Sequence, residues 1–170
     1  DRYTEDYGTG GNHLIADAAA LQFAGSLFAS QGPGEAWGRR GWDILSHHIS
    51  RQVGEDGVDF EGSAAYHRFV AELFAWAARV RSADGGEIPP AFAARLKLMA
   101  EFTTVYSRRD GRAPLWGDND NGRVLPFGAQ HLNDHSYIPA LIAVSLSGDN
   151  APAPNPDAAA ELLWSLGAYH

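Results

Sequence analysis

The sequence contains no cysteine, a single lysine and no long apolar run. Without cysteine, neither disulfides nor thiolate metal sites can contribute to structure or chemistry. No apolar stretch reaches the 18 or more residues that indicate a membrane-spanning helix. The formal charge of −8 also argues against sequence-independent nucleic-acid binding, which needs a basic surface. These absences leave a globular domain with no nucleic-acid partner and no membrane span.

Composition limits the fold more than it limits the function. With 170 residues, 45% of them hydrophobic, the chain is long enough for one domain with a core but hardly for two. We therefore expect a single domain over residues 1–170. Twelve arginines accompany Lys97, and the guanidinium fork suits carboxylate and sulfate recognition. A GC-rich genome produces the same arginine bias, so this feature does not decide the function.

Strand signals are weak, because strict alternation is rare and no Asn-Gly hairpin separates two apolar runs. Helical spacing of apolar residues is instead frequent, and it predicts an all-α fold. The six stretches that show it are 14–28, 37–48, 69–80, 92–106, 137–144 and 162–166.

Several residues mark where these helices begin. Asn12 is a plausible cap for the first helix, and Ser63 is placed to cap the third. Pro89-Pro90 is expected to start the fourth helix. Pro139 is tolerable only within the first turn of the fifth.

The short connections predict which helix ends meet. Sequential helices joined by short turns are antiparallel neighbours, so the start of the first helix, the end of the second and the start of the third share one rim. The end of the fourth helix and the start of the fifth reach the same rim. The opposite connections, at 31–34, 84–90 and 147–156, contain ordinary turn residues. The polar features predicted to gather at the rim are Asn12, His13, the 54–62 loop, Tyr66, the 117–123 loop and His135.

Tyr66, His67 and Arg68 lie in the first turn of the third helix. A free phenol has a pKa of about 10, so proton transfer near neutrality requires a neighbouring positive charge. The cluster is thus a candidate proton-transfer site. A tyrosine packed against neighbouring helices beside an exposed His-Arg pair explains the same residues.

Residues 8–17, GTGGNHLIAD, place glycines before Asn12 and His13 at a helix start. Glycines allow close approach of a ligand, and free N–H groups favour an anion. The simpler interpretation is an asparagine cap with a solvent-facing histidine. The Lys-Ser/Thr of a phosphate-binding loop is missing, and His13 with Asp17 supplies only two potential metal ligands. We expect no metal and no cofactor.

Residues 117–123, GDNDNGR, look like a calcium loop but fail its pattern. Starting from Asp118, the EF-hand glycine position holds Arg123 and the terminal glutamate position holds Ala129. A tight polar turn with Asx hydrogen bonds is the alternative. Asp118 and Asp120 can equally orient an arginine or a histidine.

Taken together, these segments resemble the heparinase II/III family of polysaccharide lyases, which includes oligo-alginate lyases. The resemblance covers roughly residues 8–168, and its most specific part is an Asn-His pair and a Tyr-His pair that begin 54 residues apart (66 − 12). The matching segments are GGNHLIADAAAL, RRGWDILSHHISRQVGEDGVDFEGSAAYHRFVAEL, PLWGDNDNGR, DHSY and AAELLWSLG.

The resemblance implies antiparallel helical hairpins that form part of an incomplete α/α toroid. It further implies that residues 1–170 are the C-terminal part of a lyase toroid, without the β-sandwich domain that follows in relatives and contributes a catalytic histidine. An acidic polysaccharide or oligosaccharide is the expected partner. The expected location is periplasmic or secreted, and the fragment by itself is expected to be inactive.

The implied chemistry is β-elimination of uronic-acid glycans. The uronate carboxylate must be neutralised, a base must take the proton from the adjacent carbon, and an acid must protonate the leaving oxygen. By resemblance, Asn12 with His13 matches the carboxylate-neutralising position and Tyr66 the proton-transfer residue, with Arg68 and His67 available to lower its pKa. Relatives often carry asparagine where this chain has Gly11. The expected substrate-binding residues are His67, Arg68, Glu61, Asp118, Asn119, Arg123 and His135.

Two other functions compete with this one. The first is a non-catalytic carbohydrate-binding or surface-polysaccharide assembly module on the same fold. The second is a glycoside hydrolase, which needs a pair of carboxylates at the rim. Glu61 with Asp118 or Asp120 is the pair that the sequence offers.

Overall fold

The computed structural model describes residues 10–127, 130–147, 160, 162 and 163. This part of the chain contains five α-helices and no β-strand, which confirms the predicted all-α class. The predicted last helix, at 162–166, lies largely outside the described residues. The helices are α1 (Gly11–Leu27), α2 (Gly34–Gln52), α3 (Ala64–Ala83), α4 (Pro90–Tyr106) and α5 (Ile138–Ser147).

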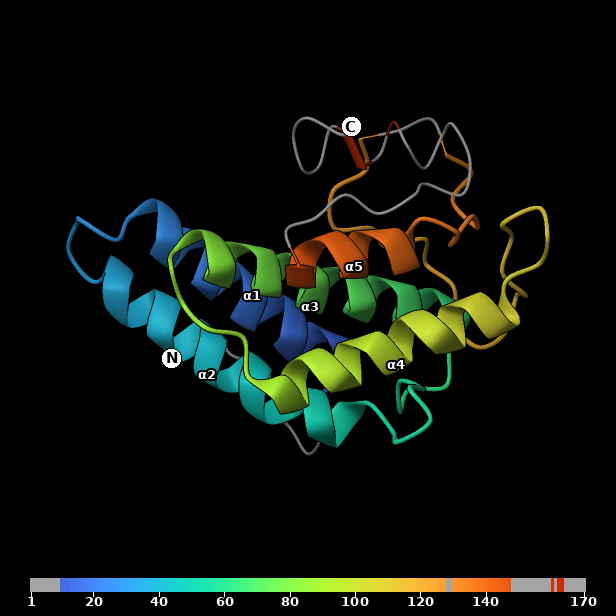
Figure 1. Ribbon diagram of the computed structural model, residues 1–170, viewed down its shortest axis with the longest axis horizontal. Helices are drawn as coiled ribbons and strands as arrows, with labels where there is room; N and C mark the ends of the chain where they lie inside the picture. Colours follow the sequence, from blue (N-terminus) through green and yellow to red (C-terminus); the bar gives the residue numbers. More distant parts are fainter. Residues whose placement is uncertain (1–9, 128–129, 148–159, 161, 164–170) are drawn as a thin grey trace.

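The helices form antiparallel hairpins along the long axis of the molecule (Figure 1). The turn between α1 and α2 lies at the far left of that view, whereas the ends of α2 and α4 and the start of α3 lie toward the other side. Helix α1 packs along α2 and α3, and α5 packs on α3 and α4. In its described residues, 107–127 and 130–137, the long connection from α4 to α5 contains no strand but has an isolated antiparallel bridge between Arg112 and Asp134.

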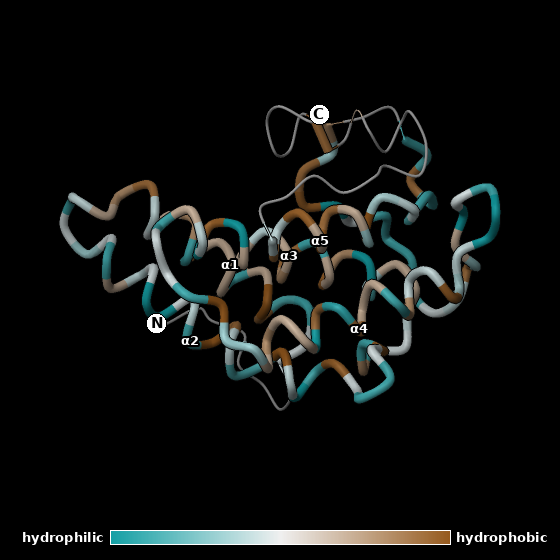
Figure 2. The backbone as a smooth tube through the Cα atoms, viewed as in Figure 1, coloured by the Kyte–Doolittle hydropathy of each residue, from teal (hydrophilic) through white to brown (hydrophobic). Residues whose placement is uncertain are grey.

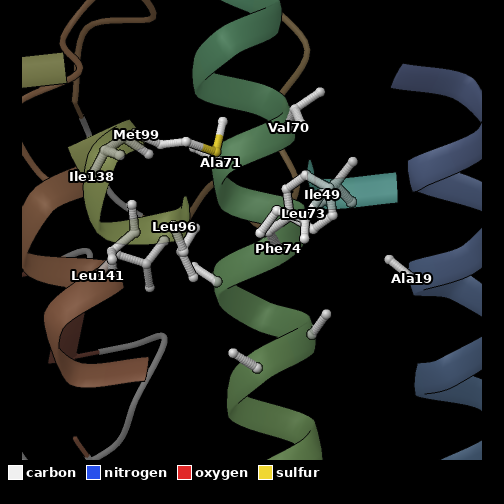
Figure 3. Packing of buried hydrophobic residues seen from close by; sticks show 14 of the residues in the cluster. Ala19, Ile49, Val70, Ala71, Leu73, Phe74, Leu96, Met99, Ile138 and Leu141 are labelled. Carbon is white, nitrogen blue, oxygen red and sulfur yellow. The ribbon is translucent and has the colours of Figure 1, made fainter. Parts of the chain in front are cut away.

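Helix α3 is the central element of the core. Figure 3 shows it between α1 on one side and α4 with α5 on the other. Its innermost residues are mostly small, since Ala71, Ala75, Ala77 and Ala78 are fully buried together with Phe74. Alanine lets the neighbouring helices approach closely on several sides, so α3 is covered almost all round.

Hydrophobic residues follow the packed helices, and hydrophilic ones predominate in the loop that follows α4 (Figure 2). Among the residues that the structure describes, no helix combines the length and the apolarity needed to cross a membrane.

The starts of three helices follow the local signals of the sequence, and one does not. Ser63 caps α3, because its Oγ accepts the N–H of Tyr66 at 3.1 Å. Pro90 is the first residue of α4, and Pro139 lies in the first turn of α5, as predicted. The prediction that Asn12 caps α1 is wrong, since Gly10 is the cap residue and Asn12 is already helical.

At two glycines, the backbones of α1 and α2 come into direct contact. A Cβ atom on Gly25 would lie 2.1 Å from the backbone nitrogen of Gly38. A Cβ on Gly41 would lie 2.4 Å from the carbonyl oxygen of Ala18. Both distances are far below van der Waals contact, so these two positions require glycine for the helices to pack as they do.

We therefore expect Gly25→Ala to lower the free energy of unfolding by about 1–3 kcal/mol, the usual cost of overpacking. Gly38→Ala is the matched control, because its Cβ would meet nothing closer than 3.6 Å and alanine favours a helix by about 1 kcal/mol. Urea unfolding of the two variants measures the difference. Equal stabilities would contradict the close backbone contact.

Candidate functional site

The start of α1 is held by a carboxylate from a distant loop. Glu61 Oε1 accepts the backbone N–H of Asn12 at 2.5 Å, and Glu61 Oε2 accepts the side-chain Nδ2 of the same residue at 2.8 Å. The negative charge satisfies a helix N-terminus that Gly10 leaves without a side-chain cap. A Cβ on Gly11 would lie 2.9 Å from Glu61 Oε1, so this neighbour also leaves room for the carboxylate.

The long loop is fastened to the start of α3. The N–H of Ala64 donates to the carbonyl of Trp116 at 3.0 Å, and Ser63 Oγ donates to the carbonyl of Asp118 at 2.5 Å. A Cβ on Gly117 would lie 2.7 Å from the carbonyl oxygen of Gly62, so the two segments are in backbone contact. The predicted convergence of the 54–62 loop, the start of α3 and the 117–123 loop is confirmed by these bonds.

Tyr66 lies at this rim with its side chain partly exposed. Its hydroxyl donates to Asp120 Oδ2 at 3.4 Å. Loss of hydration raises the pKa of Tyr66, and the negative charges of Asp120, Asp118 and Glu61 raise it further. This direction is opposite to the lowering expected from the neighbouring cations. The phenol is therefore protonated at neutral pH.

His67 points into the protein and is 1% exposed. Its Nδ1 accepts the N–H of Asp59 at 3.4 Å, so Nε2 carries the proton and faces Thr103 Oγ1 at 3.1 Å and the carbonyl of Met99 at 3.3 Å. Burial lowers the pKa of His67 to about 4. The ring is neutral at physiological pH and supplies no charge to Tyr66.

Arg68 is also buried, with 1% of its surface exposed. Its guanidinium donates from Nη1 to the carbonyl of Leu132 at 2.7 Å and from Nη2 to the carbonyl of Gly122. Both acceptors belong to the long loop. Arg68 thus ties this loop to α3. Because Arg68 and His67 are both buried, the interpretation as an exposed His-Arg pair is wrong. The charges that shift the pKa of Tyr66 are instead those of carboxylates.

A second charged pair holds the same loop from within. The side chains of Arg123 and Glu72 are 4% and 3% exposed, and Arg123 Nε lies 3.7 Å from Glu72 Oε1. The guanidinium also lies over the ring of Tyr137, 4.9 Å from its centroid. Glu72 Oε2 accepts the N–H of Val124 at 2.6 Å. Arg123, a predicted substrate-binding residue, is thereby placed in an internal ion pair.

His135, His13 and Asn119 occupy different environments. His135 is buried, and its Nδ1 lies 2.8 Å from the hydroxyl of Tyr106. Burial lowers the pKa of His135 to about 3, and the charge of Arg68 adds to this effect. His13 is exposed on the first turn of α1, and the side chain of Asn119 accepts the N–H of Asn121 at 3.2 Å.

The 117–123 loop has the Asx bonds of the alternative that we considered for it. Beside the Asn119 bond, Asp120 Oδ1 accepts the N–H of Gly122 at 3.1 Å. Asp118 and Asp120 are both exposed. Within the described part of the chain, no group of three or more His, Asp and Glu side chains is placed to hold a metal ion.

Asp59 is a site residue that the sequence reasoning missed. Its Oδ1 accepts the N–H of Glu61 at 3.1 Å, whereas Oδ2 is buried and has no hydrogen-bond partner among the described residues. Burial raises the pKa of Asp59 to about 7, and the charge of Glu61 adds to it. The spacing in VDFEG, with two carboxylates on alternate residues before a capped helix, was the available signal.

A small pocket lies next to the rim, under the start of α3. Its lining includes the buried Asp59 and His67, together with Tyr106 and Trp116. Trp116 is 53% exposed, so this pocket has an aromatic ring at its solvent side. The hydroxyl of Tyr66 faces the loop carboxylates instead.

Comparison with known proteins identifies the family. Residues 1–130 match the family model described as heparinase II/III N-terminus. The chain belongs to this family.

Curated relatives and a solved structure agree with this assignment. The chain is 30% identical over 114 residues to a heparin-sulfate lyase of Bacteroides stercoris, and 28% identical over 135 residues to one of Pedobacter heparinus. These matches cover 66% and 76% of the chain but 17% and 20% of the relatives. A crystal structure of heparinase III superposes with a TM-score of 0.64 at 26% identity, over 84% of this chain and 22% of that one.

The heparinase II/III-like chain therefore spans about a fifth of the length of the proteins that it matches. Its antiparallel hairpins are part of an incomplete α/α toroid, as the resemblance implied. The assignment of residues 1–170 to the C-terminal part of such a toroid stays a prediction.

The raised pKa of the buried Asp59 carboxyl can be tested through the pH dependence of stability. Its pKa is about 7 in the folded chain against 3.8 as the ordinary value, so the folded state binds more protons between these pH values. Asp59 therefore makes the free energy of unfolding fall as pH rises from about 4 to about 7. Asp59→Asn should remove this contribution, so the variant gains stability relative to the parent by roughly 1 kcal/mol or more between pH 4.5 and pH 7.5.

Urea unfolding of both proteins at the two pH values gives this double difference. His67 and His135 titrate in both proteins, so their contributions cancel. A stability difference that is the same at both pH values would mean that Asp59 is ionised normally.

Proposed function

We propose that the protein containing this chain is a polysaccharide lyase that cleaves uronic-acid glycans by β-elimination. The observation that carries the proposal is the pairing, at one rim, of a carboxamide at a helix start with a protonated phenol. Asn12 and Tyr66 provide these groups, and Glu61 is hydrogen-bonded to the first and acts electrostatically on the second. The membership of the heparinase II/III family supports the reaction class.

Asn12 is proposed to bind the uronate carboxylate. One N–H of its carboxamide donates to Glu61, and the second is available to an anionic ligand. Donation to the carboxylate stabilises the enolate-like dianion that forms when the adjacent carbon loses its proton. His13, exposed on the same turn, is the proposed second contact to this carboxylate.

Tyr66 is proposed to act as the acid. Its raised pKa keeps the phenol protonated, and its hydroxyl donates to the exposed carboxylate of Asp120. A proton given to the 4-linked oxygen lets this oxygen leave as a hydroxyl, while the electron pair from the broken carbon–hydrogen bond forms the new double bond. Asp120, which accepts from the phenol, is a suitable group to stabilise Tyr66 before the transfer.

The base that removes the carbon-bound proton is proposed to come from a part of the parent protein outside this chain, namely a β-sandwich domain with a histidine. The substrate is proposed to be a glycosaminoglycan-like polysaccharide, since the relatives carry the name heparin-sulfate lyase. A periplasmic or secreted location follows from this proposal, because such substrates are extracellular.

Tyr66→Phe in the full-length protein should reduce elimination by at least about 10²-fold, because general acids contribute 10²- to 10⁴-fold. Substrate affinity should be kept, since the ring remains. The ultraviolet absorbance of the conjugated product measures the rate. Tyr106→Phe is the matched control, because it removes a hydroxyl from the buried pair with His135 and should retain most activity. A loss below about tenfold for Tyr66→Phe would exclude the acid role.

Asn12→Ala should weaken both substrate binding and turnover. Its amide contacts a carboxylate that is charged in the ground state and more charged in the transition state. Steady-state kinetics on uronate oligosaccharides should show a raised KM together with a lowered kcat. If only thermal stability fell, the role of Asn12 would be limited to stabilising the start of α1. Binding by the full-length protein without any product absorbance would instead favour a non-catalytic carbohydrate-binding module.

A further inference from the structure

Both carboxylate oxygens of Glu61 accept hydrogen bonds from the same residue. One oxygen accepts the backbone N–H of Asn12 and the other accepts its side-chain amide. We infer that Glu61 is a positioning residue, which fixes the carboxamide of Asn12 for its contact with the substrate carboxylate. This inference rests on the proposed function, because it concerns the same site and reaction.

The chemistry of the bond decides the orientation of the amide. An asparagine side chain can turn over and exchange its oxygen with its nitrogen, which reverses what it offers to a ligand. A carboxylate can only accept, so Glu61 requires the nitrogen of Asn12 to face it. The remaining N–H then stays on the amide as a donor for an anion. Without Glu61, the carbonyl oxygen is free to face that anion, and the contact becomes repulsive.

The surrounding chain is shaped to hold Glu61 in this place. The N–H of Glu61 donates to Asp59 Oδ1, and Asp59 is itself buried, with 1% of its surface exposed. Gly11 has a φ of 54° and lacks the Cβ that would come within 2.9 Å of Glu61 Oε1. Gly62, with a φ of 67°, turns the chain directly after Glu61 toward the cap residue Ser63. Asp59, Gly11 and Gly62 therefore each help to place the carboxylate of Glu61.

This role differs from the direct substrate contact that the sequence led us to expect for Glu61. Both of its oxygens already have partners, and a carboxylate that faced a uronate would repel it. Its charge also contributes to the raised pKa of Tyr66. Glu61 thus acts on the reaction through Asn12, and through Tyr66 to a smaller extent.

The test is Glu61→Gln in the full-length protein. Glutamine has the same shape, but it offers one acceptor and one donor to two donors of Asn12. If the glutamine oxygen accepts the backbone N–H of Asn12, its amide nitrogen faces the side chain of Asn12. The carboxamide of Asn12 then turns its oxygen toward this nitrogen and no longer presents an N–H to the substrate carboxylate. We expect elimination to fall about tenfold or more, with no larger loss than in Asn12→Ala. Glu61→Asp keeps the carboxylate and should recover part of the rate.

Two further variants separate positioning from charge and from stability. Glu55→Gln removes the same charge from an exposed residue of the same loop and should leave the rate within about threefold. The double variant Asn12→Asp with Glu61→Gln keeps both hydrogen bonds with donor and acceptor exchanged in the side-chain bond, because the aspartate accepts from the glutamine amide. Its Tm should be close to that of the parent, whereas its turnover should be low, since an aspartate cannot donate to the substrate.

A second readout does not depend on activity. In NMR spectra of the 15N-labelled chain, the charge-assisted bond should give the two side-chain amide protons of Asn12 well-separated chemical shifts. These chemical shifts should change strongly in Glu61→Gln, but not in Glu55→Gln. Unchanged Asn12 resonances, or a rate within threefold of the parent, would overturn the inference. Turnover at the level of the parent in the double variant would overturn it as well. If the parent protein shows no elimination, the proposed function fails, and the amide resonances alone decide the positioning.

Discussion

The rim depends on a buried positive charge in α3. Arg68 reaches two carbonyls of the long connection between α4 and α5, at Gly122 and at Leu132. The described residues of that connection form no strand, so its backbone carbonyls need other partners, and the guanidinium supplies two of these bonds. A buried guanidinium without such acceptors would be costly, so the loop and the helix stabilise each other. The position of Asp120 beside Tyr66 follows from this mutual dependence.

The starts of α3, α4 and α5 and the meeting of the long loop with the start of α3 could be predicted, because they rest on local signals. Ser63, Pro90 and Pro139 act on the residues next to them, and short connections impose antiparallel packing. The helical spacing at 69–80 marks only part of the inner face of α3, because Leu73 is 5% exposed but alanines make up most of the fully buried residues. Alanine is small and common in helices, so it gives little periodic signal.

The site was predicted only in part, and the reasons are geometric. Successive residues on a helix are rotated by about 100°, so three adjacent side chains cannot share one face. Tyr66 takes the outer face, and His67 and Arg68 consequently enter the core. The partner of Asn12 lies 49 residues away, beyond the reach of any local pattern. The phenol therefore has carboxylates rather than cations around it, so its pKa is raised instead of lowered and the proposed proton-transfer role is that of the acid.

Helix α1 also acts as a rigid rod between two constraints. Asn12 lies at one end of it and Gly25 near the other, about 20 Å apart at 1.5 Å per residue. The close contact at Gly25 sets the distance between α1 and α2. If a side chain at this position pushed the helices apart, α1 would tilt and its start, which carries Asn12, would move as well. A hydrogen bond of 2.8 Å at Asn12 tolerates little such movement. The absence of one methyl group far from the rim is thus a geometric condition for the alignment of the carboxamide.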